Sequence, residues 1–453
     1  MPSCFGDAAF GTSHLAWCFR RAARYLMLFF SFESSLLSWF LNPVIRLPSN
    51  PSLGNIEECL HGIRTAPHED LWTPTNVTTG GLLGWALLNQ AIITWARRSG
   101  RGALIVETDH ASSANLVERV VHKPHGMIGA LTAERVRSNA GIDQTLQFRA
   151  AAETELRRSQ QPDQRSEGQS LLPGLETESS GIEARRRGGL SIELCADGHG
   201  ALATPRSLYS VRDGTNSPRS SSEFSDWALR EFNQSFKSGA MRSARADLPG
   251  LADIGRAVAE LFSNTHKWGR TEINGAWIRR SVRGIVTDAV RDATARFKED
   301  EPEPIRVFLD GLQGRFKSSA ASGAMEISVF DSGPGLAQHW LGRAISDAED
   351  LTAERSAVLH CLQKWGTKGG AESRGLGLHT VMANLSKADV GGLLLIRTGR
   401  LALFRDLHRN PLQTVGDAPV AVEEYKMSDL FHNKAAARVE GTLVSMIVPV
   451  PTR

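Results

Sequence analysis

The stretch from Met325 to Leu336 reads MEISVFDSGPGL, a mostly apolar run that ends in an acidic, glycine-rich turn. The apolar part favours a buried strand. Asp331 follows it directly, and Gly333 and Gly335 allow the backbone to approach a ligand closely. A carboxylate at this place can accept a hydrogen bond from the exocyclic amine of adenine but not from the carbonyl of guanine. Asp, Gly and Pro also favour ordinary turns, so this stretch alone leaves both interpretations open.

A helix is expected upstream, because apolar side chains recur there at helical spacing. These positions are Leu251, Ile254, Val258, Leu261 and Phe262. Asp253 is expected to cap the helix. Glu260 and Asn264 are four residues apart and therefore share one helix face. An amide oxygen can bind Mg²⁺ and a carboxylate can take a proton from water, although such a pair is also typical of a solvated face.

Two shorter motifs follow towards the C-terminus. Residues 374–378 read RGLGL and open a predicted helix, whose first N–H groups can hold phosphate oxygens. This motif departs from the dinucleotide fingerprint G-x-G-x-x-G, because Thr380 stands at the third glycine position. Residues 440–449 read EGTLVSMIVP and predict a final strand that is entered through Gly441 and Thr442.

The order of these four motifs resembles the gyrase, chaperone, histidine-kinase and mismatch-repair (GHKL) ATPase superfamily, over residues 253–449. The resemblance implies ATP and Mg²⁺ as ligands. It also implies a Bergerat-type fold, an α/β sandwich whose mixed sheet is covered by helices on one face. The whole layout is similar to uncharacterised bacterial ATP-binding proteins that carry a helical segment, here residues 74–96, ahead of such a domain.

The resemblance also implies roles for individual residues. Asp331 would bind the adenine amine, directly and through water, in a base pocket lined by Gly333 and Gly335. Thr442 would reach the same carboxylate through a water molecule. Asn264 would bind the Mg²⁺ that bridges the phosphates. The residues implied to close over the phosphates are Gly375, Gly377 and Leu378, with Lys364 and Lys368 in a lid formed by residues 337–374. Both lysines also suit an ordinary charged surface, so this role stays open for them.

Two residues of the predicted helix point to different branches of this superfamily. Glu260 stands where a glutamate activates the attacking water in the gyrase, chaperone and mismatch-repair branches, so it is the candidate catalytic residue. Lys267 stands where histidine kinases often place a residue that reaches the phosphates. The upstream histidines, none of them in a convincing helix pair that would carry a phosphorylated histidine, are His110, His122, His125 and His199.

Three functions therefore remain open. The first is a Mg²⁺-dependent ATPase that acts as a conformational switch in signalling, stress or defence. The second is a histidine- or serine-type protein kinase, and the third is an ATP sensor without catalysis. A protein partner or a homodimer is expected in each case.

The length of 453 residues predicts more than one domain. A helix over residues 80–98 and a buried strand over residues 103–107 predict a small α/β unit before the ATP-binding domain. The expected organisation is an apolar or poorly ordered extension over residues 1–45, a small α/β domain over 46–150, a polar linker over 151–189, connecting strands and a helix over 190–240, and the ATP-binding domain over 241–453.

The composition suits a cytoplasmic protein. A net charge of +3 gives no argument for a nucleic-acid partner, and the five scattered cysteines include no C-x-x-C pair that would suggest a disulfide framework or a zinc site. Residues 25–41 read YLMLFFSFESSLLSWFL, which is short for a membrane span and contains Glu33. Any membrane contact is therefore expected only through this run.

Overall fold

The chain from Ile45 to Arg453 forms one compact unit. The computed structural model describes residues 44–78, 81–98, 102–107, 113–158, 190–197, 205, 207–212, 215–237, 250–290, 301–313, 322–363, 377–387, 391–413 and 425–451. The apolar run over residues 25–41, and most of the expected linker, lie outside these residues. Within them, no helix is both long and apolar enough to cross a bilayer.

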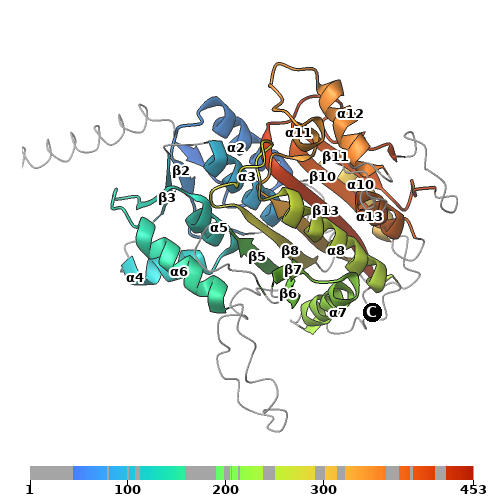
Figure 1. Cartoon of the computed structure of the whole chain (residues 1–453), viewed down its shortest axis with the longest axis horizontal. Helices are drawn as coiled ribbons and strands as arrows, with labels where there is room; N and C mark the ends of the chain where they lie inside the picture. The colour runs from blue at the N-terminus through green and yellow to red at the C-terminus, as the bar shows by residue number, and fades with distance from the viewer. Residues whose placement is uncertain are drawn as a thin grey trace, which may run out of the picture. The chain divides into compact units, whose positions relative to one another are not determined.

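A seven-stranded sheet forms the centre of the unit (Figure 1). In spatial order its strands are β12 (Ser428–Asp429), β11 (Leu401–Asp406), β10 (Leu393–Gly399), β13 (Val439–Pro451), β9 (Ser322–Asp331), β8 (Val282–Val290) and β5 (Ser191–Ala196). Every neighbouring pair is antiparallel. A separate hairpin is made by β6 (Tyr209–Arg212) and β7 (Thr215–Pro218).

One face of this sheet packs against C-terminal helices. The helices that contribute to the core on this face are α7 (Ser221–Lys237), α8 (Leu251–Trp268), α11 (Leu336–Leu341), α12 (Leu351–Leu362) and α13 (Gly377–Leu385). Side chains of α8 such as Val258 and Phe262 form a core with Ile327 and Val329 of β9. Because side chains alternate along a strand, the intervening residues of β9 face the opposite way.

The opposite face packs against the N-terminal part of the chain. That part contains a parallel sheet of β1 (Ile45–Arg46), β2 (Leu71–Thr73), β3 (Ala103–Val106) and β4 (Arg135–Ser138). Its helices are α2 (Leu53–Thr65), α3 (Gly84–Arg98), α4 (Ser113–Val121), α5 (Pro124–Thr132) and α6 (Thr145–Arg158). Helix α3 contacts β13, β9 and β8, and the core on this side also contains residues of α10 (Glu303–Gln313). Both faces of the central sheet are therefore covered.

The structure confirms the mixed α/β class but differs from the expected layout. The sheet was expected to be mixed and to carry helices on one face, whereas its pairings are antiparallel and both faces are covered. The reason lies in α3, where residues 84–95 are all buried. A helix that is buried on all sides belongs in an interior, so it links the two sheets instead of closing a separate domain.

Three expected boundaries also differ. The helix expected from residue 80 begins at Gly84, because Leu83 adopts a left-handed φ of 70°. The expected linker begins at residue 151, but α6 continues to Arg158 because Ala152 and Leu156 are buried one turn apart. The segment expected only to connect the domains supplies β5, which pairs with β8 as an edge strand.

The predicted helix cap at Asp253 was wrong. Helix α8 is capped by Gly250, whose φ is 85°, and Asp253 lies in the first turn. Its carboxylate instead pairs with Lys387 at 2.7 Å and with Arg256. A negative charge in the first turn still stabilises the helix, because it faces the positive end of the helix dipole.

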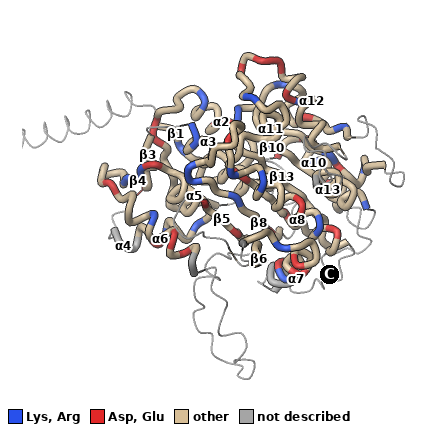
Figure 2. Tube along the Cα trace, viewed as in Figure 1, with Lys and Arg blue, Asp and Glu red and all other residues tan. Residues whose placement is uncertain are grey.

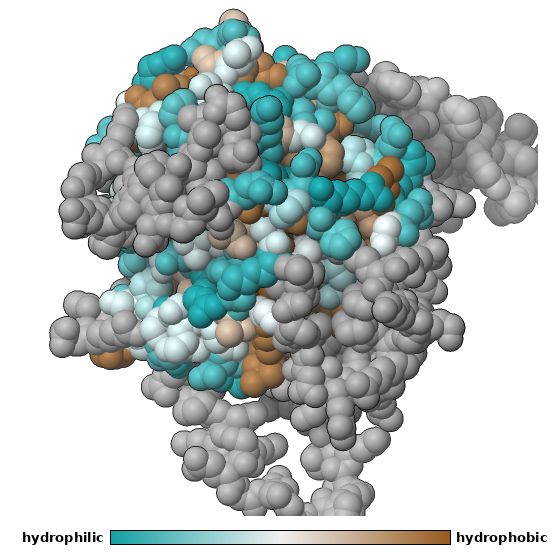
Figure 3. Space-filling model, turned by 90° about the vertical axis from the view of Figure 1, so that its right-hand side faces the viewer, coloured by the Kyte–Doolittle hydropathy of each residue, from teal (hydrophilic) through white to brown (hydrophobic). Residues whose placement is uncertain are grey.

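Charges of both signs are spread over the described chain, as Figure 2 shows, in keeping with the small net charge. On the face in Figure 3, apolar residues are scattered among polar ones wherever the surface is described. Scattered apolar side chains are normal for a protein surface and do not mark a docking site.

Candidate functional site

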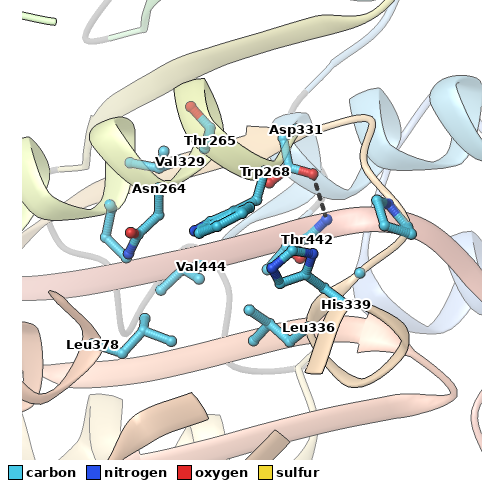
Figure 4. A pocket seen from close by; sticks show the side chains of 13 residues that line it. Asn264, Thr265, Trp268, Val329, Asp331, Leu336, His339, Leu378, Thr442 and Val444 are labelled. Atoms are coloured by element: carbon cyan, nitrogen blue, oxygen red, sulfur yellow. Dashed lines mark hydrogen bonds between the residues drawn. The ribbon is translucent and has the colours of Figure 1, made fainter. Parts of the chain in front are cut away.

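A cavity of about 60 Å³ lies between α8, the turn after β9, and strand β13 (Figure 4). Its lining residues are Leu261, Asn264, Thr265, Trp268, Val329, Asp331, Pro334, Gly335, Leu336, His339, Leu378, Thr442 and Val444. All four sequence motifs contribute to this lining, and its first and last residues, Leu261 and Val444, are 183 positions apart in the chain. The residues of the predicted site that meet here are Asn264, Asp331, Gly335, Leu378 and Thr442.

Asp331 is the buried acid of this cavity. Its Oδ1 accepts hydrogen bonds from the backbone N–H groups of Gly333 at 2.8 Å and Thr442 at 3.2 Å. Oδ2 accepts none from the residues that the structure describes. Burial raises the pKa of Asp331 to about 6, against the effect of the two N–H groups. The carboxylate is thus held in position through one oxygen, while the other can accept a hydrogen bond from a ligand.

A bulge in β13 places the Thr442 amide beside this acid. The register between β10 and β13 shifts between Thr398 and Gly399, so that two extra residues, Glu440 and Gly441, fall in β13. Gly441 has a φ of 73°, and its N–H donates to the carbonyl of Gly333 at 2.7 Å. A Cβ at Gly441 would lie 1.9 Å from the carbonyl oxygen of Asp331, so only glycine fits. In the Gly-Thr pair of the fourth motif, Gly441 therefore allows the bulge, and the bulge places the Thr442 N–H against the Asp331 carboxylate.

The end of α8 also requires a glycine, because it lies very close to Asp331. Gly269 ends the helix, and a Cβ there would lie 2.5 Å from the Cβ of Asp331. Gly335 has a φ of 86° and lies against the Thr398 side chain. These contacts bring the end of α8 and the turn after β9 together around the acid. Gly333 contributes its backbone to that contact but does not line the cavity.

Two aromatic side chains that have no part in the four sequence motifs line the cavity, and they contact each other. The rings of Trp268 and His339 lie 4.2 Å apart between centroids and are tilted by 43°. Trp268 is 43% exposed. It follows Asn264 by four residues and so shares its helix face, which is the signal that could have identified it. Both rings lie beside the apolar wall formed by Val444 and Leu336 (Figure 4).

The residues expected at the phosphate end are only partly described. Asn264 lines the cavity, while Glu260 is half-buried one turn earlier and Lys267 is exposed; neither of these two lines it. Gly377 is the first residue of α13. The expected positions that lie outside the described residues are Lys364, Lys368 and Gly375.

A buried polar network supports the cavity from β8. Arg283 pairs with Asp197 and donates to the hydroxyl of Tyr209, which lies 3.0 Å from Nδ1 of His266 on α8. Burial, with Arg270 and Arg283 nearby, lowers the pKa of His266 to about 4. Arg283 is also the strand partner of Asp331. No short-range sequence pattern marks this network, because its members come from separate elements.

Helix α3 holds the strand that carries the bulge. The Glu440 N–H donates to Oγ1 of Thr94 at 3.0 Å, and Arg98 donates to the Glu440 carboxylate at 3.2 Å. Arg97 forms a two-pronged pair with Glu272 at 2.8 and 2.9 Å. The N-terminal part of the chain therefore contacts the residue immediately before Gly441 and Thr442.

No protein-family model, curated protein or solved structure matches this chain.

Proposed function

We propose that the cavity binds the adenine of ATP and that the chain is a Mg²⁺-dependent ATPase that uses the nucleotide as a conformational switch. The observation that carries this proposal is Asp331, a buried carboxylate with one oxygen held by two backbone N–H groups. An adenine amine would donate to the other oxygen. A guanine would place a carbonyl there, and two acceptors repel each other.

The remaining walls suit a flat aromatic base. Val329, Leu378 and Val444 are apolar, and Trp268 offers a ring for stacking. A volume of about 60 Å³ is well below that of typical ligand pockets, which begin at about 300 Å³. The base therefore requires Trp268 and His339 to move outward, which their partial exposure permits. A ligand-induced opening of this kind is the first step of the proposed switch.

Asn264 fits the Mg²⁺ role in residue type and position, because its amide lines the cavity one helical turn from Trp268. Bound Mg²⁺ would neutralise phosphate charge. Glu260 is the proposed general base on the same helix. A Bergerat-type fold is part of the proposal, and it is supported by the order of the motifs and by α8 and α13 packing on one face of an antiparallel sheet.

The binding test compares two acid-to-amide changes on the same strand. Asp331→Asn should weaken ATP binding by about 10- to 100-fold, because a hydrogen bond to a charged group contributes roughly 1.5–3 kcal/mol. Glu326→Gln makes the same chemical change on the opposite face of β9 and should leave the affinity within about twofold. Titration calorimetry with ATP, GTP and Mg²⁺ measures both. Equal ATP affinity in wild type and Asp331→Asn would refute the proposal.

Turnover is tested on the same preparations. Glu260→Gln should bind ATP normally and release phosphate far more slowly than wild type. ATP labelled at the γ-phosphate separates hydrolysis from the kinase alternative, because a kinase leaves label on protein. Among the candidate acceptors, His125 is buried against Trp85 and its pKa is lowered to about 4 by burial, so it is inaccessible to a phosphoryl donor. If wild type binds ATP saturably but neither releases phosphate nor labels protein, the remaining function is that of an ATP sensor without catalysis.

A further inference from the structure

A second cavity of about 250 Å³ lies where α3 and α5 meet the segment between α8 and β8. Its polar lining includes Arg97, Arg279 and Arg280 and the acids Glu134 and Glu272. Ile93 and Ile278 are among its apolar residues, and Ser332, the neighbour of Asp331, also lines it. The cavity is thus separate from the proposed adenine pocket and shares no lining residue with it.

The arginines at this cavity are incompletely neutralised. Arg97 is paired with Glu272, and the exposed Arg279 lies 3.6 Å from Glu134. Arg280 forms no ion pair with any described residue; its guanidinium donates to the carbonyl of Ala133 at 2.8 Å. The hydrogen bond of this half-buried guanidinium is therefore to a neutral carbonyl, although Glu134 is near enough to act on its charge.

A further guanidinium converges on the same carbonyl. Arg149 of α6 donates to the Ala133 carbonyl at 2.8 Å and to that of Glu134 at 2.6 Å. It too has no ion-pair partner in the described part of the chain, although Glu134, Glu153 and Asp143 are near enough to act on it. Burial and the neighbouring arginines lower the pKa of both Arg149 and Arg280. Two like charges that share one acceptor repel each other, and a bound anion would remove that repulsion.

The backbone at Arg280 is also unusual. Its φ is 61°, in the left-handed region that costs a non-glycine residue on the order of 1 kcal/mol. This conformation carries the side chain back towards Ala133 and the cavity wall. Strained conformations of this kind persist where surrounding contacts hold them and often occur at ligand sites.

We propose that this cavity binds a small phosphorylated molecule, with Arg280 as the principal phosphate-binding residue. Arg149 does not line the cavity, but it donates to the same Ala133 carbonyl as Arg280 and would add its charge from behind the wall. Guanidinium groups suit phosphate because they donate two parallel hydrogen bonds and keep their charge. Ile93 and Ile278 would contact the carbon body of the ligand. Pockets for drug-sized ligands begin at about 300 Å³. A volume of about 250 Å³ therefore admits a phosphate with a few further heavy atoms but not a nucleoside triphosphate. The site does not depend on ATP binding elsewhere in the chain.

The test uses inorganic phosphate and pyrophosphate as probes, without Mg²⁺, and thermal unfolding of the full chain as readout. Wild type should gain about 1–3 °C in Tm at millimolar probe, because a ligand of the native state stabilises it. Arg280→Gly should lose this gain and still fold, since glycine adopts a left-handed φ without strain. Arg149→Gln should lose it as well.

Two controls separate this site from the ATP pocket and from general charge effects. Arg343→Gln alters an exposed arginine that pairs with Glu349, and it should keep the full gain. Asp331→Asn should also keep it, while losing ATP affinity. No gain in wild type, or an equal gain in Arg280→Gly and Arg149→Gln, would overturn the proposal. An Arg280→Gly variant that binds ATP but not phosphate would confirm that the two sites are distinct.

Discussion

The two faces of the seven-stranded sheet are built from the same strands and have different chemistry. On the α8 side, β9 presents Ile327 and Val329 to an apolar core that ends in the cavity around Asp331. On the α3 side, the same strand presents Glu326 and Ser328. The first face ends in a pocket, and the second combines an apolar core with buried polar groups where two parts of one chain meet.

The polar groups of the second face hold α3 at its start and in its middle. The N–H groups of Leu82 and Leu83 donate to the carboxylates of Glu301 at 2.6 Å and Glu326 at 2.9 Å. In the middle of the helix, Gln90 donates to the carbonyl of Arg397 at 3.0 Å. Unpaired N–H groups at a helix start need acceptors, and here the central sheet and its neighbouring loop supply them. The N-terminal part is therefore a structural layer of the same compact unit as the central sheet.

The largest expected effect comes from removing this layer. A fragment of residues 241–453 should fail to fold cooperatively, because it leaves Glu326 and an apolar sheet face exposed and lacks β5. A fragment of residues 45–453, which retains the compact unit, is the control and should melt like the full chain. Circular dichroism during heating distinguishes them. A soluble 241–453 fragment with a cooperative transition would mean that the two faces are independent.

The next effect concerns Glu326, whose pKa burial raises to about 7. Because the folded state then binds a proton more tightly than the unfolded state, stability is greatest below about pH 4.5 and is lost as pH rises to about 7. The loss is on the order of 3 kcal/mol. Glu326→Gln should remove this contribution. Urea denaturation at about pH 5 and about pH 8 measures it, and subtracting the variant from wild type cancels the effects of Asp331 and the histidines. Parallel pH profiles for the two proteins would contradict the prediction.

On the other face, the raised pKa of Asp331 predicts pH-dependent binding. The carboxylate must be ionised to accept well from adenine, so ATP affinity should fall below about pH 6, by up to about tenfold per pH unit. Asp331→Asn should not show this fall in affinity. The variant therefore separates protonation of Asp331 from protonation of the nucleotide, which would affect both proteins. Binding measured in buffers from about pH 5 to about pH 8 tests the prediction. A flat wild-type profile would mean that this acid does not contact the base.

The smallest expected effect tests whether the two faces communicate. Thr94→Val leaves the Glu440 N–H without its acceptor, whereas Thr94→Ser keeps the hydroxyl. The valine variant should bind ATP about three- to tenfold more weakly, because the bulge that positions Thr442 loses a support. Hydrogen exchange over residues 439–443 should rise in the same variant even without nucleotide. A lower Tm with unchanged affinity and exchange would assign Thr94 to stability alone.

The sequence by itself determined the local pieces of the site. The helical spacing of Leu261 and Asn264 and the strand that leads to Asp331 are set by short-range periodicity. The Gly441–Thr442 pair reflects a backbone conformation that only glycine allows. Asn264, Asp331 and Thr442, which these patterns singled out, line one cavity in the structure. Each motif specifies the conformation of its own segment, and the fold brings the segments together.

Only the tertiary structure decided what lies behind that cavity. The letters MEISVF predict a strand but do not say which layer Glu326 faces, because both faces of this strand are buried. The contact between Thr94 and Glu440 joins residues 346 positions apart, and the Arg149 and Arg280 guanidiniums meet only because α6 packs beside the segment before β8. Periodicity encodes a residue's orientation within its own helix or strand, whereas the partner across a layer is chosen by packing of the whole chain.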